Sequence, residues 1–217
     1  MRRTVLLVMS LTLAAAVAVS GFAVATSGDE QVPLSLQERW TEWAFGSSSN
    51  PLLQEDFCGE IVDGTFFMTV TGGAPDSVTR HIDCEVPEGT PLLVTPGGAI
   101  TWAPTDGKSY NQLFKTLLED YLADVLLRSV KVNLDGKSLD VGPLTIDHKR
   151  LSLEPGNLIQ TVDPAVTGDS TRIAFGWWFV EIADLAPGEH TLIASDRFRS
   201  GVRFRTVFTI DVVPAGT

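Results

Sequence analysis

The sequence predicts a mainly β protein, an antiparallel β-sandwich of the immunoglobulin-like or jelly-roll-like kind. Short runs rich in Val, Ile, Phe and Thr recur along the chain, and Gly, Pro, Asn and Asp separate them, which is typical of strands joined by turns. Strands and helices do not alternate regularly, so a parallel α/β sheet is not expected. Helical spacing occurs in two segments, one beginning at Ser35 and one covering residues 109–127. We expect an N-terminal helix and one helix inserted into the sandwich.

The N-terminus has the three parts of a secretory signal peptide. Arg2 and Arg3 supply a basic region, residues 4–19 form an apolar run, and a small-residue Ala-Val-Ala sequence ends at Ala25. We therefore predict cleavage after Ala25 and a secreted or periplasmic product. The alternative is a retained membrane anchor, because the apolar run approaches the length of a spanning helix. Ser, Thr and Gly residues interrupt this segment, which favours cleavage.

The rest of the chain is long enough for one domain with its own core. The 217 residues carry 27 acidic and 16 basic side chains, for a net charge of -11. A surface this acidic repels phosphate backbones and anionic lipid, so neither nucleic acid nor stable membrane insertion after cleavage is expected. The predicted organisation is a signal peptide at 1–25, a linker at 26–34 and a single β-sandwich domain at 35–217.

The chain has two cysteines, Cys58 and Cys84, and both lie in the part predicted to be exported. Oxidation is expected there, and two cysteines allow one intramolecular pairing. The disulfide would close a loop of about 27 residues and stabilise the fold by about 3 kcal/mol. The alternative, a zinc site, lacks a His or a second Cys pair at ligand spacing.

The first predicted helix begins with a capping box formed by Ser35 and Glu38, in which each side chain satisfies a free backbone N–H of the other residue. Leu36, Trp40 and Trp43 then share one face at helical spacing. We expect this face to dock the helix on the sandwich.

The second predicted helix has its own capping box, Ser109 and Gln112. Apolar residues then recur at i, i+3, i+4 and i+7 from Tyr110 to Leu126, which predicts an amphipathic helix that covers an edge or a face of a sheet. An interfacial membrane helix is the alternative, but the polar face is acidic, which argues against anionic lipid.

The strands are predicted from β-branched and aromatic runs bounded by turn residues. Asp135-Gly136 indicates a tight hairpin because Gly accepts a positive φ. The long stretch 154–172 is predicted to be a loop, of a length that is often functional or mobile. The expected strands are 65–71 and 78–86 with a turn at 73–77, then 91–95, 99–102, 130–134, 138–141, 144–153, 172–185, 190–195 and 202–213.

A series of spaced motifs runs through most of the chain after position 25. They are Trp40 and Trp43, Asn50-Pro51, Cys58, the Arg80 to Gly89 segment around Cys84, Leu134-Asp135-Gly136, and Leu185-Ala186-Pro187-Gly188-Glu189-His190-Thr191. This order resembles a family of secreted bacterial β-sandwich proteins with the pattern Trp-x-x-Trp, Cys, Arg-x-Cys-x-Val-Pro-x-Gly and Leu-x-Pro-Gly-x-His-Thr. The chain departs from it by two extra residues between Arg80 and Cys84. The resemblance implies export and a sandwich fold, and it carries over no catalytic residue.

No motif in the sequence predicts an enzyme or a cofactor. His81, His148 and His190 lack a nucleophile elbow or any other local partner set, so a hydrolase with a dispersed active site is an alternative only. His190 is expected to bond the preceding turn or to face solvent. Asp163 and Asp169 in the long loop offer oxygen ligands for Ca²⁺, and the favoured interpretation is that they are ordinary solvated acids.

Trp177 and Trp178 are adjacent within a predicted strand, so their rings point to opposite faces. Both rings are expected to pack in the core or under a helix, because large aromatic side chains are usually buried. The alternative is that Trp178 forms an exposed platform for stacking on a sugar.

Arg197, Arg199, Arg203 and Arg205 gather within nine residues of an otherwise acidic chain, around a Ser200-Gly201 turn. Convergent guanidinium groups suit carboxylate, sulfate or phosphate ligands. The favoured alternative is a solvated face paired with the protein's own acids. We hypothesise an exported, non-catalytic binding module for an extracellular polymer, such as an anionic glycan, or for a surface protein. A structural component of the envelope or extracellular matrix is the second hypothesis.

Overall fold

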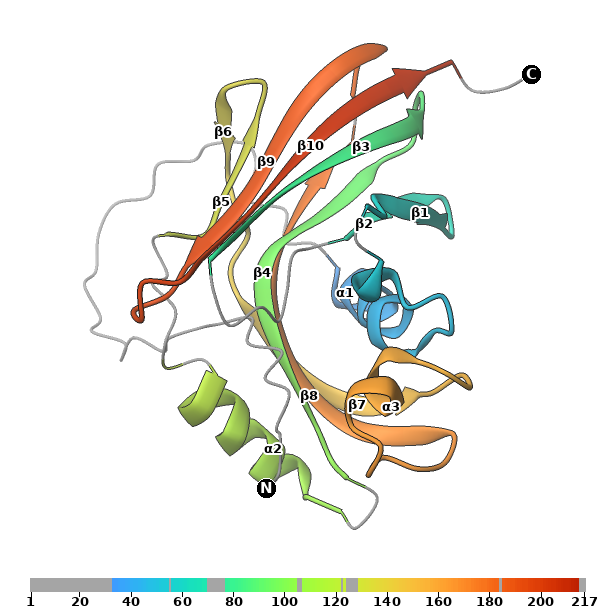
Figure 1. The fold of residues 1–217 in the computed structure, drawn as a ribbon, viewed down its shortest axis with the longest axis vertical. Coiled ribbons are helices and arrows are strands. Elements are labelled where there is room, and N and C mark those ends of the chain that lie inside the picture. The colour runs from blue at the N-terminus through green and yellow to red at the C-terminus, as the bar shows by residue number, and fades with distance from the viewer. Residues whose placement is uncertain are drawn as a thin grey trace.

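The computed structural model describes residues 33–54, 56–69, 77–104, 107–121, 123, 129–183 and 185–214 (Figure 1). The predicted signal peptide and nearly all of the predicted linker lie outside the described residues. The same is true of most of the predicted turn at 73–77 and of most of the last turns of the predicted helix at 109–127.

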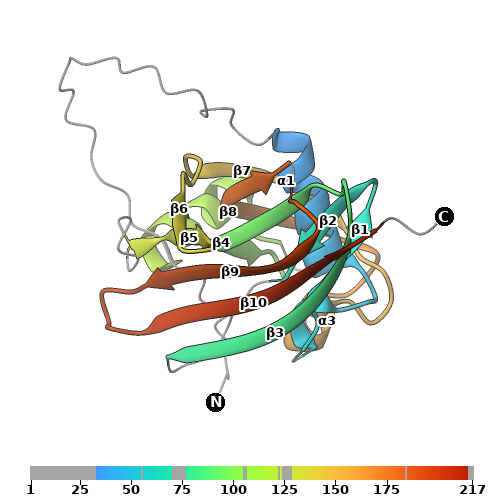
Figure 2. The same cartoon turned by 90° about the horizontal axis from the view of Figure 1, so that it is seen from above.

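Two five-stranded sheets pack on each other, which confirms the predicted mainly β sandwich. Sheet 1 has the order β1 (Gly59–Val62), β2 (Thr65–Met68), β4 (Leu92–Trp102), β8 (Ser170–Ile182), β7 (Thr145–Ser152). Sheet 2 has the order β3 (Val78–Pro87), β10 (Arg203–Val213), β9 (Gly188–Arg197), β5 (Lys131–Leu134), β6 (Lys137–Leu139). Seen from above, β9, β10 and β3 form one layer, with β4 and β8 behind them (Figure 2). The pairing is not wholly antiparallel, because β2–β4 and β3–β10 are parallel pairs.

The helices are short, and two of them continue in a π-helical turn. They are α1 (Leu34–Thr41) followed by η1 (Glu42–Gly46), the 3₁₀ turn η2 (Pro51–Leu53), α2 (Tyr110–Thr116) followed by η3 (Leu117–Tyr121), and α3 (Leu158–Val162).

The core between the sheets follows from alternation along the strands. In β10 every second residue is buried, and Phe208, Ile210 and Val212 meet apolar side chains of sheet 1. Cys58 and Cys84 form the predicted disulfide, with Cα atoms 5.6 Å apart. Cys58 directly precedes β1 and Cys84 lies in β3, so the bond joins the two sheets.

A second core lies between the outer face of sheet 1 and α1, η1 and α3, which Figure 1 shows on one side of β8. Trp40 is fully buried, and its ring meets the ring of Trp177 edge-on with centroids 5.1 Å apart. The predicted docking of the first helix is therefore confirmed. Its predicted capping box is wrong: the helix begins at Leu34, and the Pro33 carbonyl accepts the N–H groups of Leu36 and Gln37.

The second helix lies on the opposite side of sheet 1 (Figure 1). Its predicted capping box is confirmed: the Ser109 hydroxyl accepts the Gln112 N–H, and the Gln112 side chain accepts the Ser109 N–H. Leu113 and Leu117 are fully buried against β4 and β8. The helix therefore covers a face of sheet 1, as the apolar stripe predicts.

Two strand predictions are corrected by the pairing. The segments 91–95 and 99–102 belong to one strand, β4. A bulge between Val94 and Gly97 shifts its register with β8, but the strand continues. The segments 65–71 and 78–86 do not pair as a hairpin, because β2 lies in sheet 1 and β3 in sheet 2.

The long predicted loop at 154–172 is also corrected, because it contains α3. The Asn157 side chain caps this helix by accepting the Gln160 N–H. Leu158, Ile159 and Val166 are buried in the second core, so the segment is fastened by apolar contacts. A short helix of this kind gives a weak periodic signal, which is why sequence spacing missed it.

Candidate functional site

The β9–β10 hairpin positions the arginines that the sequence singled out. The two strands pair antiparallel with Arg197 opposite Arg203. The predicted turn at Ser200-Gly201 is confirmed: the Phe198 N–H donates to the Val202 carbonyl, and the Gly201 N–H donates to the Phe198 carbonyl. Gly201 has a φ of 96°, which a side chain would disfavour.

Aromatic packing fixes which way this hairpin faces. Phe198 and Phe204 are buried and meet edge-on, with ring centroids 5.1 Å apart. Alternation then turns the neighbouring arginines of both strands outward, and all four predicted arginines are exposed. Arg199 lies in the turn itself, while the other three share the outer face of sheet 2.

Strand pairing adds a lysine that the sequence reasoning missed. The register places Ser195 between Lys131 of β5 and Arg205 of β10, and both basic side chains are exposed. The pairing of β5 with β9 joins segments far apart in sequence, so no local signal could have found it. We call the resulting set the basic cluster: Lys131, Arg197, Arg199, Arg203 and Arg205.

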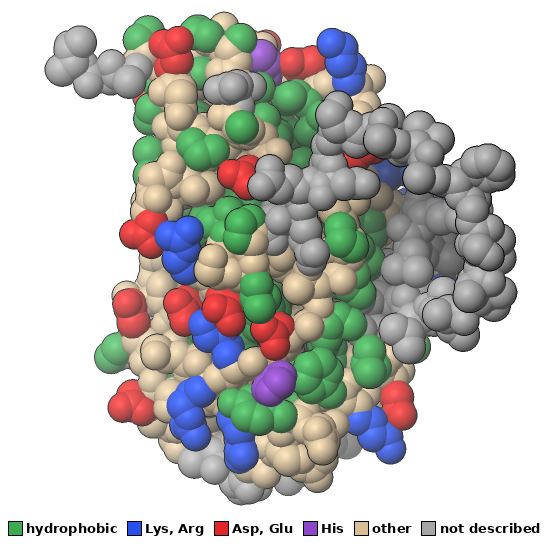
Figure 3. All heavy atoms as spheres, turned by 180° about the vertical axis from the view of Figure 1, so that it is seen from behind, with side chains coloured by type: hydrophobic (Ala, Val, Ile, Leu, Met, Phe, Trp, Pro, Cys, Tyr) green, Lys and Arg blue, Asp and Glu red, His purple; other side chains and the backbone are tan. Residues whose placement is uncertain are grey.

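The basic cluster has no acidic partner among the residues that the structure describes. Among the described residues, ion pairs form between other side chains, such as Arg39 with Asp63 and Lys149 with Glu42. The predicted alternative, in which the protein's own acids neutralise the arginines, is therefore not found within the described ranges. On the face opposite to the view of Figure 1, basic and acidic side chains are intermixed (Figure 3).

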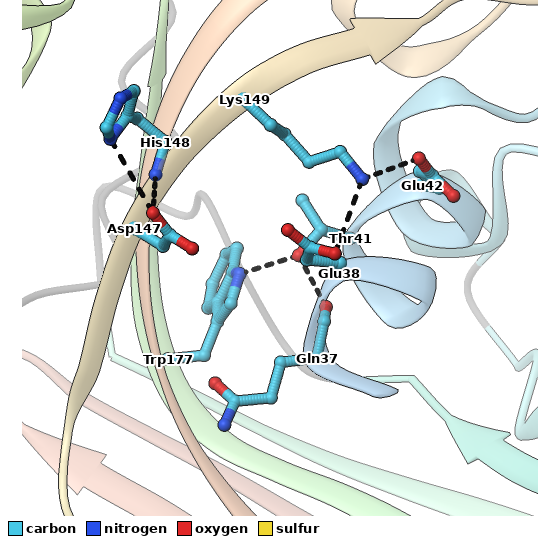
Figure 4. Close-up of polar contacts among 8 residues, drawn as sticks. All are labelled: Gln37, Glu38, Thr41, Glu42, Asp147, His148, Lys149 and Trp177. Atoms are coloured by element: carbon cyan, nitrogen blue, oxygen red, sulfur yellow. Dashed lines mark hydrogen bonds and ion pairs between the residues drawn. The ribbon is translucent and has the colours of Figure 1, made fainter. Parts of the chain in front are cut away.

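Charged groups elsewhere serve packing, as the contact between α1 and β7 illustrates (Figure 4). Lys149 of β7 lies 2.7 Å from a Glu42 oxygen and 3.9 Å from a Glu38 oxygen. Beside it, the indole N–H of Trp177 donates to the Thr41 hydroxyl at 2.9 Å. These contacts hold the helix on sheet 1.

Trp178 is not an exposed platform. Its side chain is 6 % exposed and Trp177 is fully buried, so the core interpretation of both is confirmed. Trp178 lines a shallow pocket of about 260 Å³ together with Lys131, Ser138 and Asp140. The pocket is therefore next to the basic cluster, but the ring of Trp178 offers solvent little surface for stacking.

The three histidines lie on three different strands. His81 is exposed on β3, and His148 on β7 contacts the rings of Tyr110 and Phe114 and lies 3.5 Å from Asp147. Within the described parts of the chain, no hydroxyl group hydrogen-bonds to any of these rings. The hydrolase alternative therefore gains no support from this arrangement.

His190 fastens two turns of sheet 2, and its predicted bond to the preceding turn is confirmed. One ring nitrogen lies 2.7 Å from an Asp135 oxygen, and the other lies 2.7 Å from the Ala186 carbonyl. Both neighbours are acceptors, so the ring fits best when both nitrogens carry a proton. The hydrogen bond to Asp135 raises the pKa of His190 and lowers the pKa of Asp135.

Both predicted calcium candidates follow α3: Asp163 comes directly after it, and Asp169 comes directly before β8. Asp163 accepts the indole N–H of Trp102 with one oxygen and the Ala165 N–H with the other. Asp169 accepts from the Ser170 hydroxyl. In the described ranges, no three His, Cys, Asp or Glu side chains gather as metal ligands.

A buried acid behind the basic cluster is the group that sequence reasoning overlooked. Asp196 is 5 % exposed, faces the bulge of β4 at Gly97, and has one oxygen without a hydrogen-bond partner in the described structure. Burial raises its pKa to about 7, against the opposing effect of the Phe204 N–H. Every second residue of β9, counted from Leu192, faces the core, so the sequence could have predicted that Asp196 lies on the inner face of sheet 2.

Comparisons with protein-family models, curated proteins and solved structures return no match to this chain. The family resemblance noted in the motifs therefore stays a prediction. No helix among the described residues is both long and apolar enough to cross a membrane.

Proposed function

We propose that this protein is an exported, non-catalytic binding module that holds an anionic extracellular polymer on the basic cluster. One observation carries the proposal: five exposed basic side chains gather at one end of sheet 2, without a carboxylate partner among the described residues, in a chain of net charge -11. Like charges at such spacing repel one another, and an anionic ligand relieves that repulsion.

The chemistry of the cluster favours carboxylate or sulfate groups that repeat along a chain. Guanidinium groups present planar pairs of donors that fit such oxyanions in bidentate fashion. Side chains on one sheet face are spaced by roughly 5 Å across strands and 7 Å along them. An extended polyanion can meet several of these groups at once, so weak contacts add up to useful affinity.

The disulfide supports the exported location in this proposal. Disulfides persist in secreted and periplasmic proteins and are rare in the cytosol. The bond between Cys58 and Cys84 joins the two sheets, so an oxidising compartment would favour the folded sandwich. An extracellular polymer is a ligand that such a compartment contains.

The test is the affinity of the purified protein for a polyuronate and for a sulfated polysaccharide, with a neutral glycan beside them. Replacing Arg203 and Arg205 together by Ala is expected to weaken binding of the anionic polymers by about tenfold or more, which is 1.4 kcal/mol. The matched control replaces Lys108 and Arg150, which are exposed outside sheet 2, and removes the same charge.

Binding that is unchanged in the Arg203 and Arg205 variant would overturn the proposal. So would an equal loss in the Lys108 and Arg150 control, because that result would mean that net charge alone decides retention.

A further inference from the structure

The outer face of sheet 2 carries opposite charges at its two ends. The basic cluster occupies the end near the β9–β10 turn. At the other end, Glu189 of β9 pairs with Asp211 of β10, and Asp211 pairs in turn with Glu85 of β3. Asp83 lies one row closer to the middle, and all four acids are exposed. We call these four residues the acidic end.

An uncharged band separates the two ends. Ile193 lies opposite Val207, which is beside His81, and the two aliphatic side chains are half-buried. Val207 is four residues from both Arg203 and Asp211, and Ile193 is four residues from both Arg197 and Glu189. On β9 and on β10, the outermost charges are therefore opposite in sign and equally distant from the midpoint, whereas Arg205 is mirrored by the uncharged Thr209.

From this symmetry we infer that a second copy of the chain docks face to face on the outer face of sheet 2, with its strands antiparallel to those of the first. A two-fold axis across the strands, through Val207 and Ile193, places Arg203 over the partner copy's acidic residue on β10. The same axis places Arg197 over the partner copy's acidic residue on β9. The aliphatic pair meets its own copy at the centre.

The charges select this arrangement over the alternatives. With strands parallel, basic ends would stack on basic ends and acidic ends on acidic ends, and like charges across an interface are strongly disfavoured. The antiparallel arrangement is isologous, because each copy contributes the same surface, and isologous two-fold contacts close at a dimer. An apolar centre with a charged rim is also the usual anatomy of an interface.

The size of the face predicts a weak dimer. The part of sheet 2 formed by β3, β10, β9 and β5 is about 19 Å wide and about 30 Å long. Its area is on the order of 600 Å² per copy, which is at the low end of specific interfaces. The net charge of the chain opposes association further. We therefore expect a dimer whose dissociation constant lies in the micromolar range.

This inference uses the same arginines as the proposed function, but it does not depend on it. The dimer covers the basic cluster, so an anionic polymer and a second copy compete for it. Variants of the acidic end separate the two, because they remove the dimer and leave the arginines in place.

The experiment is sedimentation equilibrium of the purified protein across micromolar concentrations at physiological ionic strength. One variant reverses the basic end, Arg197→Glu with Arg203→Glu, and the other reverses the acidic end, Glu189→Arg with Asp211→Arg. Each variant alone is expected to stay monomeric, whereas an equimolar mixture forms a heterodimer. The control, Lys108→Glu with Arg150→Glu, is expected to dimerise like the wild type.

Restoration by mixing distinguishes complementary charge from misfolding, because two misfolded chains would not repair each other. A wild type that is monomeric throughout would overturn the inference. Dimers in either variant alone, or a mixture that stays monomeric, would also overturn it. An acidic-end variant that loses dimerisation and keeps its affinity for polyanion would support the inference and the proposed function separately.

Discussion

The two sheets differ in what covers their outer faces. On sheet 1, α1, η1 and α3 bury Trp40 and Trp177 completely, and charged groups there hold a helix in place. On sheet 2, the outward side chains of β3, β9 and β10 are mostly polar or charged, with half-buried aliphatic side chains such as Ile193 and Val207 among them. Sheet 1 therefore serves stability on both of its faces, whereas the outer face of sheet 2 is the one that we propose for a partner.

The covered face of sheet 1 is expected to contribute most to the free energy of unfolding. Trp177→Ala should lower the free energy of unfolding by about 3–5 kcal/mol, because it empties the space between sheet 1 and α1. Arg205→Ala on the bare face should change it by no more than about 0.5 kcal/mol. Urea denaturation of both variants checks this. Equal losses would mean that the bare face is also structural.

The next effect concerns the link between the sheets. Replacing Cys58 and Cys84 together by Ser should cost about 3 kcal/mol, because the unfolded chain gains the freedom of an open loop. Thermal melting measures the loss. If reduction of the wild type leaves the melting temperature unchanged, the disulfide does not hold the sheets together.

The smallest expected effect is a pH dependence of stability that arises on the inner face of sheet 2 and not on its outer face. The pKa of Asp196 is about 7 in the folded protein, against an ordinary value of 3.8. Between these values the folded state holds one more proton than the unfolded state, so stability falls as pH rises through this range. Asp196→Asn should remove this dependence and raise the stability at about pH 8 by about 1–3 kcal/mol.

Melting temperatures at about pH 5 and about pH 8 test that prediction, with the exposed Asp211→Asn as the matched control. If the melting temperature of the wild type does not change across this range, the Asp196 carboxyl is in contact with water. His190 contributes in the same direction: its pKa is raised, so its stabilisation is complete below its ordinary pKa and is lost as pH rises through the raised value.

Predictions from the sequence were accurate where the signal is local. The Ser200-Gly201 turn, the Asp135-Gly136 hairpin and the Ser109 capping box each depend on residues within a few positions of one another, and each is confirmed. The Ser35 capping box failed although the same residue types are present, because the Pro33 carbonyl starts the helix earlier. A local motif therefore permits a helix start without fixing it.

The candidate site was predictable in its arginines and not in its surroundings. Four arginines within nine residues are visible in the sequence, and alternation predicts that they face outward. Lys131 joins them only because β5 pairs with β9. Glu85 lies beside Asp211, and Asp83 one row away, only because β3 pairs with β10 in parallel.

By itself, the sequence determined most of the strand and turn pattern, the outward direction of the β9–β10 arginines, the one possible disulfide and the acidic net charge. These follow from backbone sterics, side-chain period and composition, which act over a few residues or over the whole chain. Only the tertiary structure decided which strands became neighbours, because distant segments are paired by the apolar surface that they bury together. That choice gathered the charges of sheet 2 into opposite ends of one face.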